Sequence, residues 1–295
     1  MAKAIVTLVI GDKHHNLWRK LALPSWQRYA ARHGYEIIAI ERPLDESEFA
    51  KRRNVTWQKL LVLDHSEVRR FERVLWLDSD IVINDLTAPC PVDQTPPELV
   101  GAVADQALLS HPALAGPFSR INHWPGTSEE LARAGYQING LAPAGDFYLN
   151  SGTLVLSRDH RTLLQEVYAA SEDGGRLYDE QFFLSAILLR RRLFHPLDPR
   201  FNQLWLDYKH ASYAMLRIAP SMLSLCIATA LSNCFFLHFA GRHRDMERFD
   251  PAVTISGERF SLPPQYMRTI AEEWAGLAAV VERERQNATI EGTPL

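Results

Sequence analysis

The feature that most constrains the fold is a run of apolar residues that ends in two carboxylates. Residues 74–77 read Val-Leu-Trp-Leu, and Asp78-Ser79-Asp80 follows directly. A strand without polar alternation is buried on both faces, which is typical of a parallel sheet covered by helices. Its carboxyl end is the edge where open α/β sheets bind ligands. Because side chains two residues apart on an extended segment point the same way, both aspartates can face one cation.

Strand and helix patterns alternate on both sides of this run, as in a chain built from βαβ units. The helical stretch that begins near residue 18 is followed by Gly34, which suits the position just past a helix end. The predicted fold class is therefore α/β, with a Rossmann-like, mostly parallel central sheet flanked by helices. The expected strands are residues 4–10, 35–40, 73–77, 100–104 and 148–156, and the expected helices are residues 18–33, 57–71 and 179–193.

The chain is long enough for one large core, with 295 residues of which 46% are hydrophobic. We expect a single domain over residues 1–262, then a helix over residues 263–286 packed on it, and a disordered tail at residues 287–295. Residues 106–145 lack periodicity and are rich in glycine, proline and asparagine. Such a stretch inside a compact domain is typical of a functional loop.

Charge and cysteine content exclude several classes of function. The net charge is -3, whereas binding to a phosphate backbone needs many lysines and arginines on one face. Nucleic acid is therefore not an expected partner. The three cysteines show no CxxC pair, which argues against a disulfide framework and a cysteine metal site and favours a reducing compartment.

One segment has the length of a membrane span. Residues 218–237 carry no charge but contain Pro220 and several serines and threonines. We interpret them as a buried helix followed by a core strand at residues 235–237. The apolar run at residues 4–10 is too short for a secretory signal. The sequence thus predicts a cytoplasmic protein without a transmembrane span, with peripheral contact to a membrane left open.

Later segments extend the pattern that the two aspartates begin. In chain order they are Tyr148 to Leu156 with Asn150-Ser151-Gly152, then Glu180-Gln181 with Ser185, then Phe201-Asn202, then Phe236 to Arg244 with His238 and Gly241. This ordered set resembles the GT-A-fold glycosyltransferases, especially the retaining glycogenin-like and bacterial lipopolysaccharide galactosyltransferase-like group, glycosyltransferase family 8. The chain departs from that group's motifs by carrying Glu180 for aspartate, Ser185 for asparagine and Arg244 for lysine.

The resemblance implies a GT-A fold and a divalent cation, Mn²⁺ or Mg²⁺, held by Asp78, Asp80 and His238. His238 follows the apolar strand at residues 235–237, so its ring can reach the sheet edge where the carboxylates gather. Two carboxylates and a neutral imidazole suit an octahedral ion such as Mn²⁺. The alternatives are structural: two aspartates in an exposed turn, and a core histidine satisfied by hydrogen bonds.

The reaction implied is transfer of a hexose from a nucleotide-diphosphate sugar to an acceptor hydroxyl, with retained anomeric configuration. The acceptor is left open between a saccharide, a lipid-linked saccharide and a protein. Catalytic contacts are expected from Glu180 and Gln181, although an acid at a helix start is also favourable for electrostatic reasons alone. Substrate contacts are expected from Thr7, Leu8, Lys59, Ser79, Asp146, Asn150, Ser151, Gly241 and Arg244.

A second enzyme class also places DxDxV after an apolar strand. Haloacid-dehalogenase-like phosphatases do so, and Asp78 would then be the nucleophile. Those enzymes usually carry the motif close to the start of the domain and a G-D-x-x-x-D pattern later, and Gly145-Asp146 here leads to Asn150 instead of an acid. A sugar nucleotidyltransferase would need a G-x-G-T-R loop after the first strand, which is absent from this sequence. A non-catalytic carbohydrate-binding protein would not need the paired aspartates.

Overall fold

A six-stranded sheet forms the centre of the molecule. Its strands are β1 (Lys3–Leu8), β2 (Tyr35–Ile40), β3 (Arg73–Leu77), β5 (Val100–Ala104), β6 (Leu149–Ser157) and β7 (Phe194–Pro196). They lie in the order β2-β1-β3-β6-β5-β7. Neighbours run parallel except where β6 pairs with β3 and with β5. The predicted mostly parallel sheet is confirmed, and β6 is its antiparallel strand.

The computed structural model describes residues 2–104, 128–172, 174, 180–211, 213, 216, 219–251, 254–256 and 259–261. The predicted helix over residues 263–286, the predicted tail and most of the predicted functional loop lie outside this part of the chain. The division into domains therefore stays a prediction.

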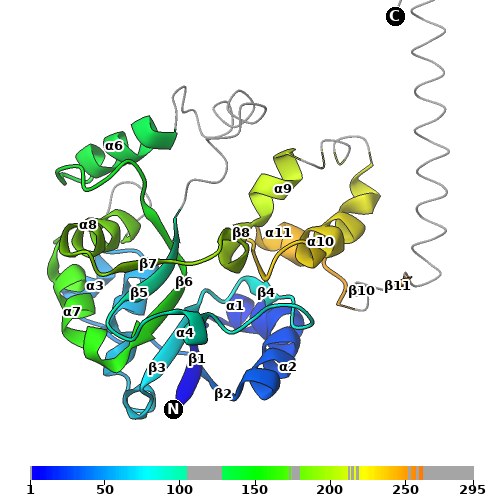
Figure 1. Cartoon of the computed structure of the whole chain (residues 1–295), viewed down its shortest axis with the longest axis horizontal. Coiled ribbons are helices and arrows are strands. Elements are labelled where there is room, and N and C mark those ends of the chain that lie inside the picture. Colours follow the sequence, from blue (N-terminus) through cyan, green and yellow to red (C-terminus); the bar gives the residue numbers. More distant parts are fainter. Residues whose placement is uncertain are drawn as a thin grey trace, which may run out of the picture.

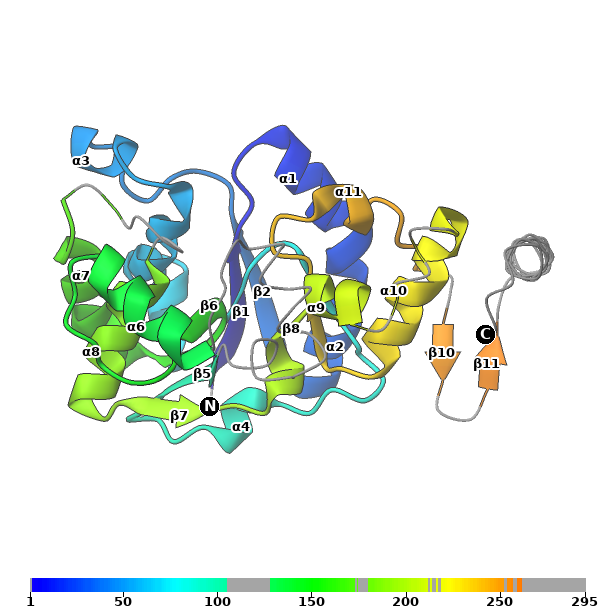
Figure 2. The same ribbon diagram turned by 90° about the horizontal axis from the view of Figure 1, so that it is seen from above.

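Helices cover both faces of the sheet (Figures 1 and 2). Ile5 and Leu75 point to the face covered by α2 (Leu23–His33) and share a core with Trp26. Val74 and Trp76 point to the other face and pack in a second core. The helices of that second face are η2 (Val55–Asp64), α7 (Arg161–Ala169) and α8 (Gln181–Arg191). All of β3 is buried, which explains the continuous apolar sequence of residues 74–77.

Two predicted helices differ from the structure. The helical region predicted from residue 18 begins at residue 12, as α1 (Asp12–Leu17), continues through a π-helical turn η1 (Trp18–Ala22) and ends as α2. Gly34 follows it with φ 71°, as expected. The helix predicted over residues 57–71 is wrong in type: it is a 3₁₀ segment, η2, followed by the short η3 (Val68–Arg70). Most of η2 is buried, so its apolar sequence does not reveal a helical period.

A second, three-stranded sheet has the order β4-β9-β8. It consists of β4 (Ile81–Ile83), β8 (Gln203–Leu204) and β9 (Phe236–His238). β4 directly follows the Asp78–Asp80 segment and pairs antiparallel with β9, with Ile81 opposite His238. The predicted core strand near residues 235–237 is thus β9, and the helix before it is α10 (Leu223–Ser232). Among the described residues, no helix is long and apolar enough to cross a membrane.

The remaining elements are short or peripheral. They are α3 (Glu48–Lys51), α4 (Pro91–Gln94), α6 (Ser128–Ile138), η4 (Arg158–His160), η5 (Pro199–Asn202), α9 (Trp205–Ala211), η7 (Pro220–Met222), α11 (His243–Met246), β10 (Thr254–Ser256) and β11 (Arg259–Ser261).

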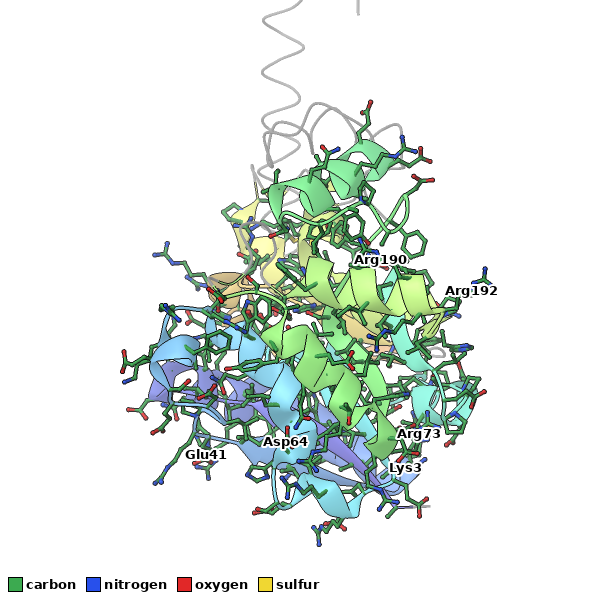
Figure 3. All side chains as sticks on the ribbon, turned by 90° about the vertical axis from the view of Figure 1, so that its left-hand side faces the viewer. Lys3, Glu41, Asp64, Arg73, Arg190 and Arg192 are labelled. Atoms are coloured by element: carbon green, nitrogen blue, oxygen red, sulfur yellow. The ribbon has the colours of Figure 1, made fainter. Side chains whose placement is uncertain are left out.

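The basic cluster at the end of α8 lies on the surface. Figure 3 shows Arg192 pointing away from the body of the molecule. Arg191 pairs with Glu166 at 2.7 Å, and the Arg190 guanidinium donates to the carbonyl oxygen of Ala142. Arg190 and Arg191 are engaged locally, so the three arginines do not form a row of free cations.

Candidate active site

The segment from Asp78 to Asp80 is a turn that joins the two sheets. The Asp78 amide donates to the Gly152 carbonyl oxygen at 2.8 Å, which ties the turn to β6. The Ile81 amide donates to the Asp78 carbonyl oxygen at 3.1 Å, and the Phe239 amide donates to the Asp80 carbonyl oxygen at 3.0 Å. The backbone on both sides therefore fixes where the two carboxylates stand.

His238 completes a group of three side chains that can bind a metal. Its Nε2 lies 3.2 Å from Asp80 Oδ1 and 3.8 Å from Asp78 Oδ2. One ligand atom from each of the three residues lies within 4.8 Å of the others. The His238 side chain is 5% exposed, whereas that of Asp78 is 26% exposed, so solvent reaches the group from the carboxylate side. This donor set fits Mn²⁺ or Mg²⁺ and leaves positions for substrate oxygens.

The second oxygen of Asp80 is held by the segment after β9. The Gly241 amide donates to Oδ2 at 2.9 Å, and His243 Nε2 lies 3.5 Å from the same atom. Gly241 has φ +77°, a conformation that favours glycine. Burial disfavours the charge on Asp80, but His238 and these hydrogen bonds hold its pKa well below the ordinary value. Burial likewise opposes the charge on His238, yet Asp80 and Asp78 raise its pKa.

Lys59 places a buried positive charge beside the carboxylates. Its side chain is 4% exposed, and Nζ lies 2.9 Å from Asp78 Oδ1 and 3.1 Å from Glu180 Oε1. It also donates to Ser151 Oγ at 3.2 Å. Burial opposes the ammonium, but the two carboxylates outweigh it and raise the pKa of Lys59. Lys59 is therefore a buried, paired lysine and not a solvated one.

The start of α8 is fixed to the start of β6. Glu180 is 1% exposed and accepts a hydrogen bond of 2.6 Å from Ser151 Oγ. Gln181 Oε1 accepts one of 3.0 Å from the Ser151 amide. Burial opposes the charge of Glu180, but Lys59 and the Ser151 hydrogen bond lower its pKa. The predicted catalytic residues Glu180 and Gln181 thus belong to the same network as Lys59, which also pairs with Asp78.

The lowered pKa of Glu180 predicts a pH-dependent contribution to stability. A carboxyl whose pKa falls on folding stabilises the protein fully above the unfolded value, about 4.3 for glutamate, and loses this as pH falls through the folded value. Wild type is therefore expected to be more stable than Glu180→Gln at about pH 7, with a smaller difference at about pH 3.5. Urea unfolding of both proteins checks this. A difference that grows on acidification would contradict the assignment.

Asn202 belongs to the site, although in the sequence it stands out only as part of a Phe-Asn pair. Its Oδ1 lies 2.8 Å from His238 Nδ1, and its Nδ2 donates to Asn150 Oδ1 at 2.7 Å. Trp76 is a second residue without a predicted role, and its Nε1 donates to Asp78 Oδ1 at 3.1 Å. Neither role has a local sequence signal, because each depends on side chains meeting in space.

The other predicted residues divide into two sets. Thr7 and Leu8 end β1 just beyond the Val6–Trp76 pair, and Ser79 lies between the two aspartates, so all three are at the edge of the site. Thr7 Oγ1 is buried without a hydrogen-bond partner among the described residues.

Asp146 and Arg244 are not brought into the carboxylate group. Asp146 pairs on the surface with Arg133 at 2.8 Å, and both side chains are 58% exposed. Arg244 is exposed on α11 and forms no ion pair with another described residue.

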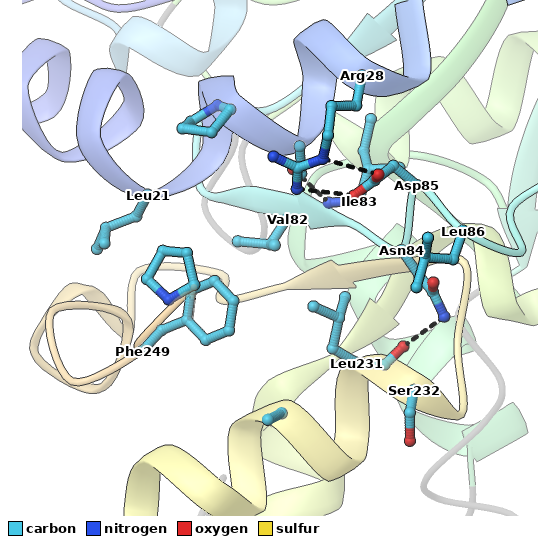
Figure 4. A pocket seen from close by; sticks show the side chains of 14 residues that line it. Leu21, Arg28, Val82, Ile83, Asn84, Asp85, Leu86, Leu231, Ser232 and Phe249 are labelled. Atoms are coloured by element: carbon cyan, nitrogen blue, oxygen red, sulfur yellow. Dashed lines mark hydrogen bonds and ion pairs between the residues drawn. The ribbon is translucent and has the colours of Figure 1, made fainter. Parts of the chain in front are cut away.

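A separate pocket lies between α2, β4 and α10 (Figure 4). Leu21, Val82 and Phe249 contribute apolar walls, and Arg28 pairs with Asp85 through two contacts of 2.8 and 2.9 Å at its side. Asp78, Asp80 and His238 do not line it. It is therefore distinct from the candidate active site.

Comparison with known proteins places the fold. No family model and no curated protein matches the sequence. A glycosyltransferase involved in the glycosylation of the major capsid of PBCV-1 is similar over 84% of this chain and 99% of its own, at 16% identity and a TM-score of 0.50. The galactosyltransferase LgtC is similar over 90% of this chain and 99% of its own, at 15% identity and a TM-score of 0.46. The likeness to the first of these structures and the mostly parallel sheet show that this chain has the GT-A glycosyltransferase fold.

Proposed function

We propose that this chain is a divalent-metal-dependent glycosyltransferase that transfers a hexose from a nucleotide-diphosphate sugar to an acceptor hydroxyl. The observation that carries the proposal is the grouping of Asp78, Asp80 and His238 within 4.8 Å at the ligand-binding edge of a GT-A fold. Lys59 and Glu180 lie directly behind this group. The acceptor is a saccharide, a lipid-linked saccharide or a protein.

The predicted site residues have the following proposed roles. Asp78, Asp80 and His238 hold Mn²⁺ or Mg²⁺, which when bound neutralises charge on the diphosphate. Gly241 orients Asp80 through its amide. Arg244, exposed on the neighbouring helix, donates to the diphosphate oxygens. The remaining contacts to base, ribose and sugar are proposed for Thr7, Leu8, Ser79, Asp146, Asn150, Ser151 and Gln181.

We propose that transfer proceeds on one face of the sugar, with retention. The acceptor oxygen bonds to the anomeric carbon as the bond from that carbon to the phosphate oxygen breaks, and the acceptor proton passes to the departing phosphate. Glu180 is 1% exposed and paired with Lys59. A carboxylate so enclosed and neutralised is a poor nucleophile, so we propose that Glu180 acts through Lys59, which it holds beside Asp78. A covalent glycosyl adduct on Glu180 would overturn this role.

The test is release of nucleoside diphosphate from a panel of nucleotide sugars in the presence of Mn²⁺. Wild type is expected to act on one donor, and Asp78→Asn and Asp80→Asn are expected to lose activity by about 100-fold or more, the scale of losing a group that stabilises the leaving charge. Asp85→Asn is the matched control, since Asp85 pairs with Arg28 in the separate pocket. Product NMR with the identified donor shows whether the anomeric configuration is retained.

Assaying the same proteins with a phosphomonoester distinguishes the transferase from the phosphatase alternative. If no donor is cleaved while a phosphomonoester is hydrolysed and the Asp78→Asn variant is inactive, the transferase proposal is wrong. Activity of Asp80→Asn equal to that of wild type would remove Asp80 from the metal group.

A further inference from the structure

We infer that Asn202 is a positioning residue that fixes the tautomer of His238. The backbone amide of Gly152, acting through Asn150, determines which way the side-chain amide of Asn202 is oriented. The inference rests on the proposed function, because it concerns how His238 presents a lone pair to a cation. It assigns a role to a residue outside the ligand group itself.

The orientation of the Asn202 amide follows from a backbone N–H group, which can only donate a hydrogen bond. The backbone N–H of Gly152 donates to Asn150 at 2.9 Å, so the Asn150 atom there is the acceptor Oδ1. The same oxygen faces Asn202 at 2.7 Å, so the Asn202 atom there has to be the donor Nδ2. The other end of the Asn202 amide is then Oδ1, which lies 2.8 Å from His238 Nδ1. A carbonyl oxygen only accepts, and His238 Nδ1 therefore carries the hydrogen.

This tautomer is the opposite of the one that Asp80 alone would select. Nε2 lies 3.2 Å from Asp80 Oδ1, a carboxylate oxygen that attracts an N–H. A neutral imidazole carrying its hydrogen on Nε2 would turn that hydrogen toward the carboxylates, and its lone pair, on Nδ1, would face Asn202 instead of a cation. With the hydrogen held on Nδ1 by Asn202, the neutral ring offers Nε2 instead. A partner that fixes the second nitrogen of a metal-binding histidine is a recurring device.

The network is shielded from water, which strengthens its preference for one orientation of the two amide groups. Asn150, Asn202 and His238 are 8%, 5% and 4% exposed. Water could otherwise donate to or accept from either amide atom and relax the order. Asn202 is itself placed by the fold, because its neighbour Phe201 is fully buried and the carbonyl oxygen of Phe201 accepts from Thr153 Oγ1 at 2.9 Å.

The experiment compares wild type with two substitutions at one position. Asn202→Leu keeps the approximate shape and removes the acceptor, whereas Asn202→Asp keeps an acceptor for His238 Nδ1. The first readout is the ¹⁵N spectrum of His238 in metal-free protein at a pH where the ring is neutral, since the nitrogen shifts separate N–H from lone pair. The second is Mn²⁺ affinity, followed by the EPR signal of free Mn²⁺.

We expect wild type to show the hydrogen on Nδ1. Asn202→Leu is expected to show hydrogen on Nε2 and to bind Mn²⁺ about 10- to 100-fold more weakly, the usual effect of losing a partner of a metal ligand. Asn202→Asp is expected to restore the Nδ1 hydrogen, with an Mn²⁺ affinity between those of wild type and Asn202→Leu, because an oxygen replaces the Nδ2 donor to Asn150. Restoration by aspartate separates positioning from a mere packing role.

Two results would overturn the inference. One is a wild-type spectrum with the hydrogen on Nε2, which needs no variant and so holds even if Asn202→Leu fails to fold. The other is a folded Asn202→Leu protein with wild-type spectrum and affinity. If wild type binds no Mn²⁺ at all, the proposed function fails, while the spectrum still decides the tautomer.

Discussion

Replacing Lys59 by methionine is expected to destabilise the protein by about 3–5 kcal/mol, the cost of breaking a buried ion pair. The Lys59 and Glu180 side chains are 4% and 2% exposed, with 3.1 Å between Nζ and Oε1. Methionine keeps most of the length of lysine but not its charge, so Glu180 is left as a buried carboxylate without a cation. The charge of Asp78 is destabilised less by the loss of Lys59, because 26% of the Asp78 side chain is exposed to water. Urea unfolding of wild type and variant measures the difference.

Two further variants make this prediction sharp. The double variant Lys59→Met/Glu180→Gln removes both buried charges and is expected to recover much of the loss, giving a coupling above about 1 kcal/mol in a double-mutant cycle. Arg70→Met is the matched control, because Arg70 pairs with Glu36 at 2.6 Å while both side chains are more than half exposed. That substitution is expected to cost less than about 1 kcal/mol. If Lys59→Met costs no more than Arg70→Met, the buried pair does not hold the site together.

Replacing Gly152 by alanine is expected to weaken Mn²⁺ binding by about 100-fold or more, the upper end of what disturbing a metal ligand's surroundings does. An added Cβ would lie 2.7 Å from His238 Nδ1 and 3.1 Å from Asn150 Oδ1. The strand cannot yield easily, since the Gly152 carbonyl oxygen accepts from the Asp78 amide. The ring of His238 therefore has to leave its present position beside Asp80. Titration of free Mn²⁺ by EPR measures the loss.

Gly145→Ala serves as the control for this substitution. An added Cβ there meets only the Cδ1 end of Leu189 at 3.3 Å and a carbonyl oxygen at 3.9 Å. Leucine can turn aside, so this variant is expected to bind Mn²⁺ as wild type does. Wild-type affinity in Gly152→Ala would show that the His238 ring is not a ligand or is free to relocate.

The sequence predicts the carboxylates and the sheet well because their signals are local. Asp78 and Asp80 follow an apolar strand directly, and the buried strand β3 has the predicted bounds. The same holds for β2 and β5, whose predicted residues match the structure. A strand buried on both faces has several consecutive apolar residues, so it can be predicted without knowledge of distant parts of the chain.

The network behind the carboxylates could not be predicted in this way. Lys59 on η2 meets Glu180 at the start of α8, and nothing near Lys59 in the sequence indicates that its partner is so far along the chain. Lys59 also lies on a 3₁₀ segment, η2, and not on the predicted helix. The role of Asn202 depends on which amide atom faces which neighbour, and a residue type does not encode that orientation.

The pairing of β4 with β9 bears on when Asp78, Asp80 and His238 come together during synthesis. Asp80 accepts a hydrogen bond from Gly241, which lies 161 residues later in the chain, and the paired strands are separated by a similar stretch. Contacts between such distant residues form slowly, and a chain emerges from the ribosome amino end first. The two aspartates are therefore present long before His238 joins them. If the three side chains hold a cation, full coordination is expected only after β9 has paired with β4, and a nascent chain that stops short of β9 has an incomplete set of candidate ligands.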